Sequence, residues 1–256
     1  MDLGLTNKIA LITGSSRGIG RAIALGLAAE GCHVSLCARG ADALHQTETD
    51  VAAKGVQTLA ISADVTVPGE IDKVVQATLD RWGRIDILIN NVGGSKWTPF
   101  ESVPDEEWMD IFNLNLFAAV RTTRAVLPSM KAQGSGSIIT ISSIFGRESG
   151  GPVTYNATKA AEISMSKMLA KEMAKTGIRV NTVAPGSVIF PGGNWQKRLD
   201  ADPEGIRAFV DREIPCGRFG TPEEIANVVV FLSSDRASWV TGACVNVDGC
   251  QSRALI

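Results

Sequence analysis

The stretch from Thr13 to Gly20, Thr-Gly-Ser-Ser-Arg-Gly-Ile-Gly, joins a run of aliphatic residues to a helical pattern. Its glycines, Gly14, Gly18 and Gly20, permit a tight turn and a close approach of the backbone to a ligand. After a strand, such a turn presents the amide groups of a helix N-terminus to a phosphate. An ordinary Gly-rich loop would look similar, but the position after the first strand favours a dinucleotide-binding fold.

Outward from this turn, short apolar runs alternate with longer helical patterns. Continuous runs such as Ile85–Ile89 are typical of parallel strands covered on both faces. The sequence therefore predicts an α/β fold, a doubly wound parallel sheet of about seven strands with helices on both faces. The expected strands are Lys8–Thr13, His33–Cys37, Gln57–Ser62, Ile85–Asn90, Ser137–Ser142, Arg179–Ala184 and Cys244–Val247. The expected helices are Ile19–Glu30, Ala41–Lys54, Gly69–Trp82, Asp105–Ala132, Pro152–Lys175 and Pro222–Ser233.

The alternation is not interrupted by a linker or repeat, so we expect one domain over residues 1–256. The least regular stretch, residues 186–220, is rich in Pro and Gly and is a candidate lid over a site. The helix Asp105–Ala132 carries apolar side chains around most of its circumference. Neighbouring helices of the same chain or a partner subunit could cover its second face.

Composition excludes several classes of protein. The chain has 256 residues, 45% of them hydrophobic, and a net charge of −2. It carries no basic block for nucleic acid, no apolar run of about 18 residues for a membrane span and no secretory signal. Its five cysteines include no CxxC pair, and its two histidines lie far from any ligand pattern. We therefore expect neither a disulfide framework nor a metal site, and a cytoplasmic location.

The end of the second expected strand bears on the choice of nucleotide. Enzymes that prefer NAD usually place an acid there, to accept from the ribose 2′-hydroxyl. This chain instead reads Ser-Leu-Cys-Ala-Arg-Gly from Ser35 to Gly40, and Arg39 and Arg17 both lie on this side. Two guanidinium groups suit a 2′-phosphate, although both could be solvated surface arginines. We expect NADP(H), with NAD(H) possible.

The only tyrosine of the chain, Tyr155, precedes Lys159 by four residues in an expected helix. This spacing puts the phenol and the ammonium on one face. A phenol has an unperturbed pKa of about 10, which makes it a poor acid–base catalyst near neutral pH. A neighbouring cation favours the phenolate, so this pair indicates proton exchange with a carbonyl or alcohol oxygen.

With these residues in hand, the chain resembles the classical short-chain dehydrogenase/reductase family along essentially its whole length. The turn matches the family's TGxxxGxG motif, and Tyr155 with Lys159 matches its YxxxK motif. Val92 stands where the NNAG element usually has alanine, and Cys250 replaces the usual second glycine after the last strand. Further matches lie at Asp64–Val65, Pro185–Gly186, Ile214–Glu224 and Val247–Gly249.

The resemblance implies two more catalytic residues, Ser143 and Asn115. Ser143 lies 12 residues before Tyr155, where the family has a serine that holds the substrate oxygen; Ser142 beside it could merely cap backbone. In the family, the asparagine fixes a water that links Lys159 to solvent, while an amide bonded to backbone is the plainer interpretation of Asn115. The cofactor-binding residues expected are Gly14, Ser16, Arg17, Gly18, Ile19, Gly20, Arg39, Asp64, Val65, Asn91, Val92, Gly93, Tyr155, Lys159, Pro185, Gly186 and Val188.

The family implies hydride transfer between NADP(H) and a ketone, 3-oxoacyl carbonyl or secondary alcohol, most like the 3-oxoacyl carrier-protein reductases. An NAD-dependent alcohol, sugar or steroid dehydrogenase is the alternative. Enoyl reductases separate the tyrosine and lysine by seven positions, and a non-catalytic nucleotide sensor would usually have lost one of them. Aromatic residues that could wall a substrate pocket are Trp97, Phe145, Phe190 and Trp195.

Two further expectations concern partners. An acyl carrier protein would need a basic docking face, and the cations at Lys131, Lys171 and Lys175 are too few to decide whether one exists. The family commonly assembles as tetramers through the fourth and fifth helices, which agrees with the apolar character of Asp105–Ala132. We therefore expect a homotetramer or homodimer that acts on a small carbonyl or alcohol substrate.

Overall fold

A single parallel sheet organises the chain, whose computed structural model describes residues 1–255. The strand order is β3-β2-β1-β4-β5-β6-β7, and every neighbouring pair is parallel. The predicted fold class is confirmed. Because the order reverses between β1 and β4, a crevice opens at the carboxyl ends of these two strands. The strands are β1 Ile9–Thr13, β2 His33–Ala38, β3 Thr58–Ser62, β4 Ile87–Asn90, β5 Gly136–Ile141, β6 Ile178–Pro185 and β7 Cys244–Val247.

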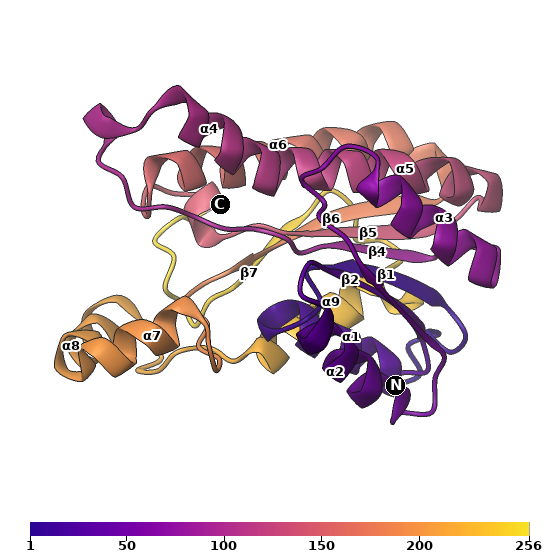
Figure 1. Ribbon diagram of the computed structural model, residues 1–256, viewed down its shortest axis with the longest axis horizontal. Helices are drawn as coiled ribbons and strands as arrows, with labels where there is room; N and C mark the ends of the chain where they lie inside the picture. The colour runs from indigo at the N-terminus through magenta and orange to yellow at the C-terminus, as the bar shows by residue number, and fades with distance from the viewer. Residues whose placement is uncertain (256) are drawn as a thin grey trace.

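Helices cover the two faces of the sheet as separate layers (Figure 1). One layer contains α1 Gly18–Ala29, α2 Ala41–Ala52 and α9 Pro222–Ser233. The other contains α3 Glu70–Trp82, α4 Asp105–Phe112, α5 Ala118–Gln133 and α6 Val153–Met173. Among residues 1–255, none of the helices has the length and apolarity needed to cross a bilayer.

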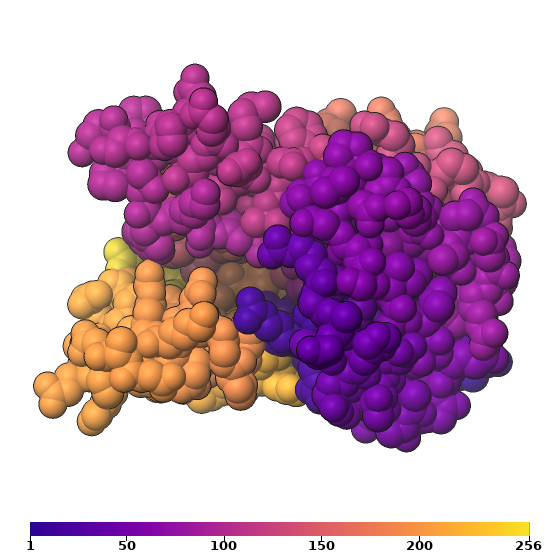
Figure 2. All heavy atoms as spheres, in the orientation of Figure 1, coloured from indigo at the N-terminus to yellow at the C-terminus, as the bar shows by residue number. Residues whose placement is uncertain are grey.

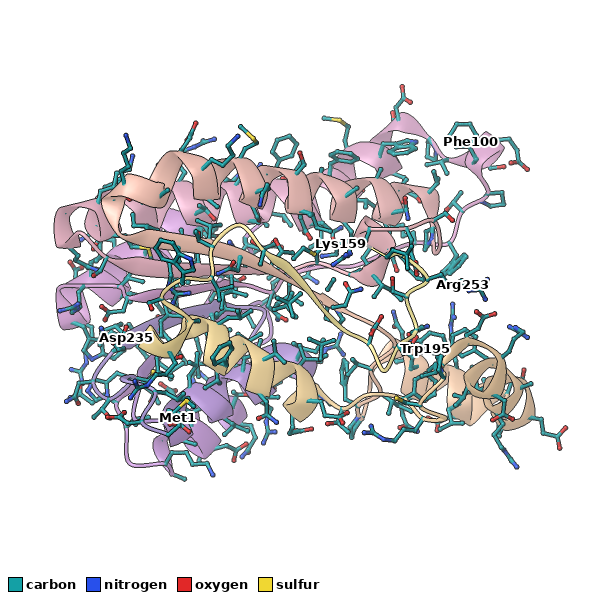
Figure 3. The ribbon with its side chains drawn as sticks, turned by 180° about the vertical axis from the view of Figure 1, so that it is seen from behind. Met1, Phe100, Lys159, Trp195, Asp235 and Arg253 are labelled. Carbon is teal, nitrogen blue, oxygen red and sulfur yellow. The ribbon has the colours of Figure 1, made fainter. Side chains whose placement is uncertain are left out.

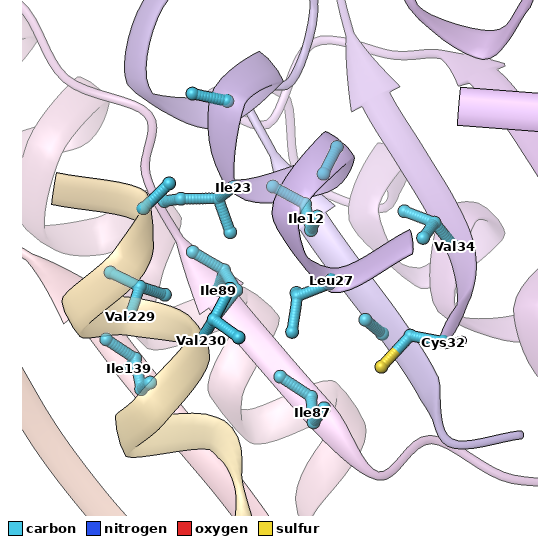
Figure 4. Packing of buried hydrophobic residues seen from close by; sticks show 14 of the residues in the cluster. Ile12, Ile23, Leu27, Cys32, Val34, Ile87, Ile89, Ile139, Val229 and Val230 are labelled. Atoms are coloured by element: carbon cyan, nitrogen blue, oxygen red, sulfur yellow. The ribbon is translucent and has the colours of Figure 1, made fainter. Parts of the chain in front are cut away.

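The core consists of two apolar clusters, one on each side of the sheet. Neighbouring strand residues go to opposite clusters: Ile12 and Ile89 pack with Leu27 of α1, whereas Leu11 and Leu88 pack on the other side. Figure 4 shows Ile89 and Leu27 in the first cluster. All five side chains are completely buried, which explains why the central strands are continuous apolar runs.

The expected helix Asp105–Ala132 is interrupted. Between α4 and α5 lies a π-helix, Asn113–Phe117, and Asn115 at its centre is completely buried. The Asn115 amide donates to the Ile111 carbonyl four residues earlier, at 2.8 Å. A π-turn inside an α-helix commonly marks a functional site, because it redirects a side chain that the regular period would aim elsewhere.

The stretch 186–220 is more regular than expected. It contains two helices, α7 Asn194–Ala201 and α8 Pro203–Glu213, which lie beyond the end of the sheet (Figure 1). Asp202 caps α8 by accepting from the Gly205 amide, and Pro203 takes the first helical position. The Pro and Gly content suggested a loop, although Asp202-Pro203 is itself a signal of a helix start.

Truncating a central strand residue should test this core. We expect Ile89→Ala to lower the free energy of unfolding by about 2–5 kcal/mol, because it leaves a cavity between β4 and α1. Val67→Ala is the control: this side chain is 47% exposed, and its loss should cost about 0.5 kcal/mol or less. Urea denaturation measures both. Equal effects of the two substitutions would contradict the assignment of the core.

Candidate active site

The crevice at the carboxyl ends of the strands contains two adjoining cavities. The larger, of about 790 Å³, runs from the turn after β1 past the ends of β2 and β3. The smaller, of about 260 Å³, lies against the ends of β5 and β6 and the start of α6. Figure 2 shows the molecule hollowed between the α7–α8 segment and the sheet domain. The two cavities form one continuous site, because they share lining residues, among them Ile19, Asn91, Gly93, Val188 and Trp195.

The turn from Gly14 to Gly20 forms one wall of the larger cavity. Gly14 and Gly18 have positive φ angles of 67° and 55°, which favour glycine. A Cβ at Gly20 would collide with the Gly14 carbonyl, so this position also requires glycine. The N-cap of α1, Arg17, makes no capping bond through its side chain. The first turn of α1 thus lacks a side-chain cap from its N-cap residue, and the turn fits the phosphates of a dinucleotide.

Where the larger cavity passes the end of β2, it is lined by Arg39, and β2 itself contains no acidic residue. Burial and then the charge of Asp64 raise the pKa of the Cys37 thiol to about 12, so this thiol is neutral. Hydrogen bonds from Thr66 lower the pKa of the Asp64 carboxyl, and Arg39 lies 3.7 Å from that carboxylate. The Arg39 side chain is 72% exposed, so its guanidinium has donors available to a further anion.

The smaller cavity brings together Ser143, Tyr155 and Lys159. The two serines at the end of β5 differ in their hydrogen bonds. Ser142 donates to the Lys159 carbonyl at 2.9 Å, so its proton is engaged within the protein. Ser143 accepts from the Phe145 amide at 3.2 Å, which leaves its own proton for another acceptor. This difference supports Ser143 as the residue that contacts substrate.

Lys159 is 3% exposed and lies beneath the phenol, with Nζ 5.5 Å from the centroid of the Tyr155 ring. Its ammonium donates to the Ile141 carbonyl at 3.0 Å and to both Glu162 oxygens at 3.0 and 3.1 Å. Burial works to lower the pKa of Lys159, but the charges of Glu162 and Tyr155 outweigh it and raise that pKa. Sequence reasoning missed Glu162, although it follows Lys159 by three residues on the same helix.

Two asparagines fix the backbone around the site. The Asn115 amide donates to the Gly94 carbonyl and accepts from the Gly94 amide, at 3.0 and 3.1 Å. The Asn91 amide donates to the carbonyls of Thr13 and Gly14, at 3.2 and 3.0 Å. Asn115 thus anchors the loop after β4, and Asn91 ties that loop to the glycine turn. A role for Asn115 in a proton relay stays a prediction.

Residues 14–250 match the family model described as "Enoyl-(Acyl carrier protein) reductase". Curated relatives include the 3-oxoacyl-[acyl-carrier-protein] reductases of Synechocystis sp. and Escherichia coli, each 40% identical over 248 residues. These alignments cover 96% of this chain and 97–98% of the relatives. The chain belongs to the short-chain dehydrogenase/reductase family.

Solved structures of this family agree over the whole chain. L-Sorbose reductase from Gluconobacter frateurii, complexed with NADPH and L-sorbose, superposes with a TM-score of 0.94 at 39% identity, covering 100% of both chains. Levodione reductase has a TM-score of 0.91 at 34% identity, covering 97% of this chain and 99% of its own. This chain is therefore an oxidoreductase of the short-chain dehydrogenase/reductase type, acting between carbonyl and alcohol.

The aromatic residues predicted for the substrate pocket divide into two groups. Phe190 and Trp195 line both cavities. Trp97 is 66% exposed and lies against Arg198, whose guanidinium carbon is 5.6 Å from the Trp97 ring centroid and 5.1 Å from that of Trp195. Phe145 packs where side chains at Gly150 and Gly151 would stand.

Most of the other predicted residues reach the site. The larger cavity is lined by Gly14, Ser16, Arg17, Ile19, Arg39, Asp64, Val65, Asn91, Val92, Gly93 and Val188. The smaller is lined by Ile19, Asn91, Gly93, Ser143, Tyr155, Lys159, Pro185, Gly186 and Val188. In the part of the chain that the structure describes, five predicted residues line neither cavity: Gly18, Gly20, Trp97, Asn115 and Phe145.

Proposed function

We propose that this chain reduces a ketone to a secondary alcohol with NADP(H), and that Tyr155 exchanges the proton with the substrate oxygen. The observation that carries this proposal is the convergence of Ser143, Tyr155 and Lys159 on one cavity. That cavity adjoins the glycine turn and shares residues with the cavity beside it. The NADPH-bound L-sorbose reductase, 39% identical, supports the choice of cofactor.

Each residue of this group has a distinct chemical role. The cofactor, when bound, supplies the hydride that reduces the carbonyl carbon. The free proton of Ser143 hydrogen-bonds the carbonyl oxygen, which polarises the carbonyl and stabilises the negative charge that develops on it. Tyr155 donates its phenolic proton to that oxygen. The buried Lys159 ammonium stabilises the phenolate left behind, and in the oxidation direction the same groups act in reverse.

Two arginines support NADP(H) over NAD(H). Arg17 and Arg39 both line the larger cavity, and the neutral Cys37 thiol stands near the end of β2, where NAD enzymes usually place an acid. A 2′-phosphate can accept bidentate bonds from guanidinium groups, whereas a 2′-hydroxyl gains little from them. The same cavity would hold NAD(H) without this contribution.

The lining of the smaller cavity supports a small ketone with an apolar flank. Val188, Phe190 and Trp195 provide apolar surface in the cavity that Ser143 and Tyr155 also line. The curated relatives named above act on 3-oxoacyl groups carried by a protein, whereas the structural relative binds a sugar. We therefore propose the shared chemistry, a ketone next to a modest apolar group, as the substrate class.

Replacing Tyr155 by phenylalanine tests the proposed function. The variant keeps the ring but has no proton to donate, so we expect kcat for carbonyl reduction to fall by about 10²–10⁴-fold. Binding of NADPH, measured by its fluorescence, should remain close to that of the wild type. Turnover is followed as loss of NADPH absorbance with a panel of ketones. Wild-type turnover in Tyr155→Phe would refute the mechanism.

Removing one guanidinium tests the cofactor. We expect Arg39→Ala to raise KM for NADPH by about 10–100-fold, because a charge-assisted hydrogen bond is worth about 1.5–3 kcal/mol. KM for NADH should stay unchanged. Arg81→Ala, at an exposed arginine of α3 outside both cavities, is the control. A wild-type enzyme with higher kcat/KM for NADH than for NADPH would contradict the cofactor assignment.

We also propose a homotetramer, or a homodimer, located in the cytoplasm. Apolar side chains on the π-helix, α4 and α6 stay exposed in the single chain, namely Met109, Phe117, Val153 and Met168. Such a face supports burial against a second copy. All five cysteines are free thiols, which supports a reducing compartment. Light scattering should give a multiple of the single-chain mass, and the mass of one chain would contradict the assembly.

A further inference from the structure

Glu162 is a carboxylate buried in the interior of an enzyme, and the mechanism above does not use it. It lies on α6 one turn after Lys159 and is 1% exposed. Both its oxygens accept from the Lys159 ammonium, at 3.1 and 3.0 Å. Figure 3 shows Lys159 between α6 and the sheet. An ionised carboxylate at such a depth is costly unless it is paired and hydrogen-bonded.

The surroundings of Glu162 tie it to the catalytic group. Across residues 1–255, Lys159 is the single charged group found to act on Glu162. Burial raises the pKa of the Glu162 carboxyl, and the charge of Lys159 works to lower it. The Ser142 hydroxyl, at the end of β5, donates to the Lys159 carbonyl, so this bond joins α6 to the end of β5. Within residues 1–255, the ion-pair partner of Glu162 is therefore the lysine beneath the Tyr155 phenol.

The same contacts restrain the lysine. A lysine ammonium has three N–H donors. Two groups of the protein accept from them, the Ile141 carbonyl and the Glu162 carboxylate. A long, flexible side chain is thus held in one position next to the Tyr155 ring.

We propose that Glu162 is a positioning residue that holds the Lys159 ammonium beneath Tyr155 and keeps it charged over the working pH range. This proposal rests on the proposed function, in which that ammonium stabilises the phenolate. A buried lysine without a counter-ion tends to lose its proton, because burial disfavours the charged form. The charge of Glu162 opposes this loss, and the pKa of Lys159 is raised despite the burial of the group.

The sign of the effect follows from the charges of the group. Ser142 is neutral, so Lys159 and Glu162 are the coupled ionisable pair at this place. Deleting the negative charge of Glu162 makes it easier to remove the proton of the buried Lys159 ammonium, and a neutral lysine no longer stabilises the phenolate of Tyr155. Reduction needs a charged lysine and a protonated phenol. When Glu162 is neutralised, the reductase activity should therefore be lost at a lower pH than in the wild type.

The experiment compares Glu162→Gln, which keeps the size of the side chain, with Glu162→Asp, which keeps its charge. In Glu162→Gln we expect the alkaline limb of kcat/KM for reduction to move to lower pH by on the order of one unit. Phenolate absorbance, which in this chain comes only from Tyr155, should appear at higher pH in the cofactor-free protein, because a neutral lysine no longer stabilises the phenolate. Glu162→Asp should restore most of both shifts.

Asp86→Asn is the matched control. Asp86 is also a buried carboxylate in an ion pair, 6% exposed and 2.6 Å from Arg84, but it lies at the opposite end of β4 from the cavities. Its loss should reduce stability and leave the alkaline limb in place. The same limb and the same phenolate titration in Glu162→Gln as in the wild type would overturn the proposal.

Two results keep this test separate from that of the proposed function. Full activity of Tyr155→Phe refutes the proposed function, whereas an inactive Tyr155→Phe with unmoved titrations in Glu162→Gln refutes only the role of Glu162. If Glu162→Gln does not fold, nitrogen NMR of Lys159 in the wild type decides. A charged ammonium well above neutral pH supports the proposal, and a neutral amine near pH 7 overturns it.

Discussion

The close contact between Gly14 and Gly20 is the constraint on which the rest of the site depends. The backbone at Gly20 lies so close to the Gly14 carbonyl that a Cβ there would collide with it. Glycine at this position therefore allows the chain to turn directly from β1 into α1. Asn91, from the neighbouring strand end, then bonds the Gly14 carbonyl through its amide. The two strand ends on either side of the reversal in strand order are thereby held at a fixed separation. This fixed separation leaves a crevice between the strand ends, and both cavities lie in it.

The catalytic side of this crevice depends on buried polar groups that satisfy one another. Ser142 and Ser143 are adjacent at the end of β5. Both serines line the smaller cavity, but the Ser142 hydroxyl donates to the Lys159 carbonyl, whereas the Ser143 hydroxyl accepts from the Phe145 amide. The bond from Ser142 anchors α6 to the sheet at the level of Lys159. Two kinds of contact thus fix the Lys159 ammonium beneath the phenol. One is the bond from Ser142 to the Lys159 backbone, and the other is the set of bonds that Nζ itself makes.

The sequence allowed the sheet and the glycine turn to be predicted because each depends on local patterns. Continuous apolar runs identify buried parallel strands, and the ends of β7 and α9 agree with the expectation at both termini. The π-helix could not be predicted from the apolar period, and within it the buried Asn115 amide bonds the Ile111 carbonyl. Phe145 lies two residues after Ser143, yet it packs against Gly150 and Gly151, a tertiary contact that no local pattern reveals.

Helix α6 shows how function shapes the packing of this fold. Its buried face carries Thr158, Lys159, Glu162 and Ser166, where a helix against a sheet would ordinarily bury aliphatic side chains. Tyr155, Lys159, Glu162 and Ser166 follow one another at spacings of four, three and four residues, so they form one stripe along the helix. Such a stripe is tolerated because its members bond one another or the ends of β5: Ser166 contacts Thr140, and Lys159 contacts Ile141. A single aliphatic replacement in this stripe would leave a buried partner unsatisfied, so its polar residues depend on one another as a set.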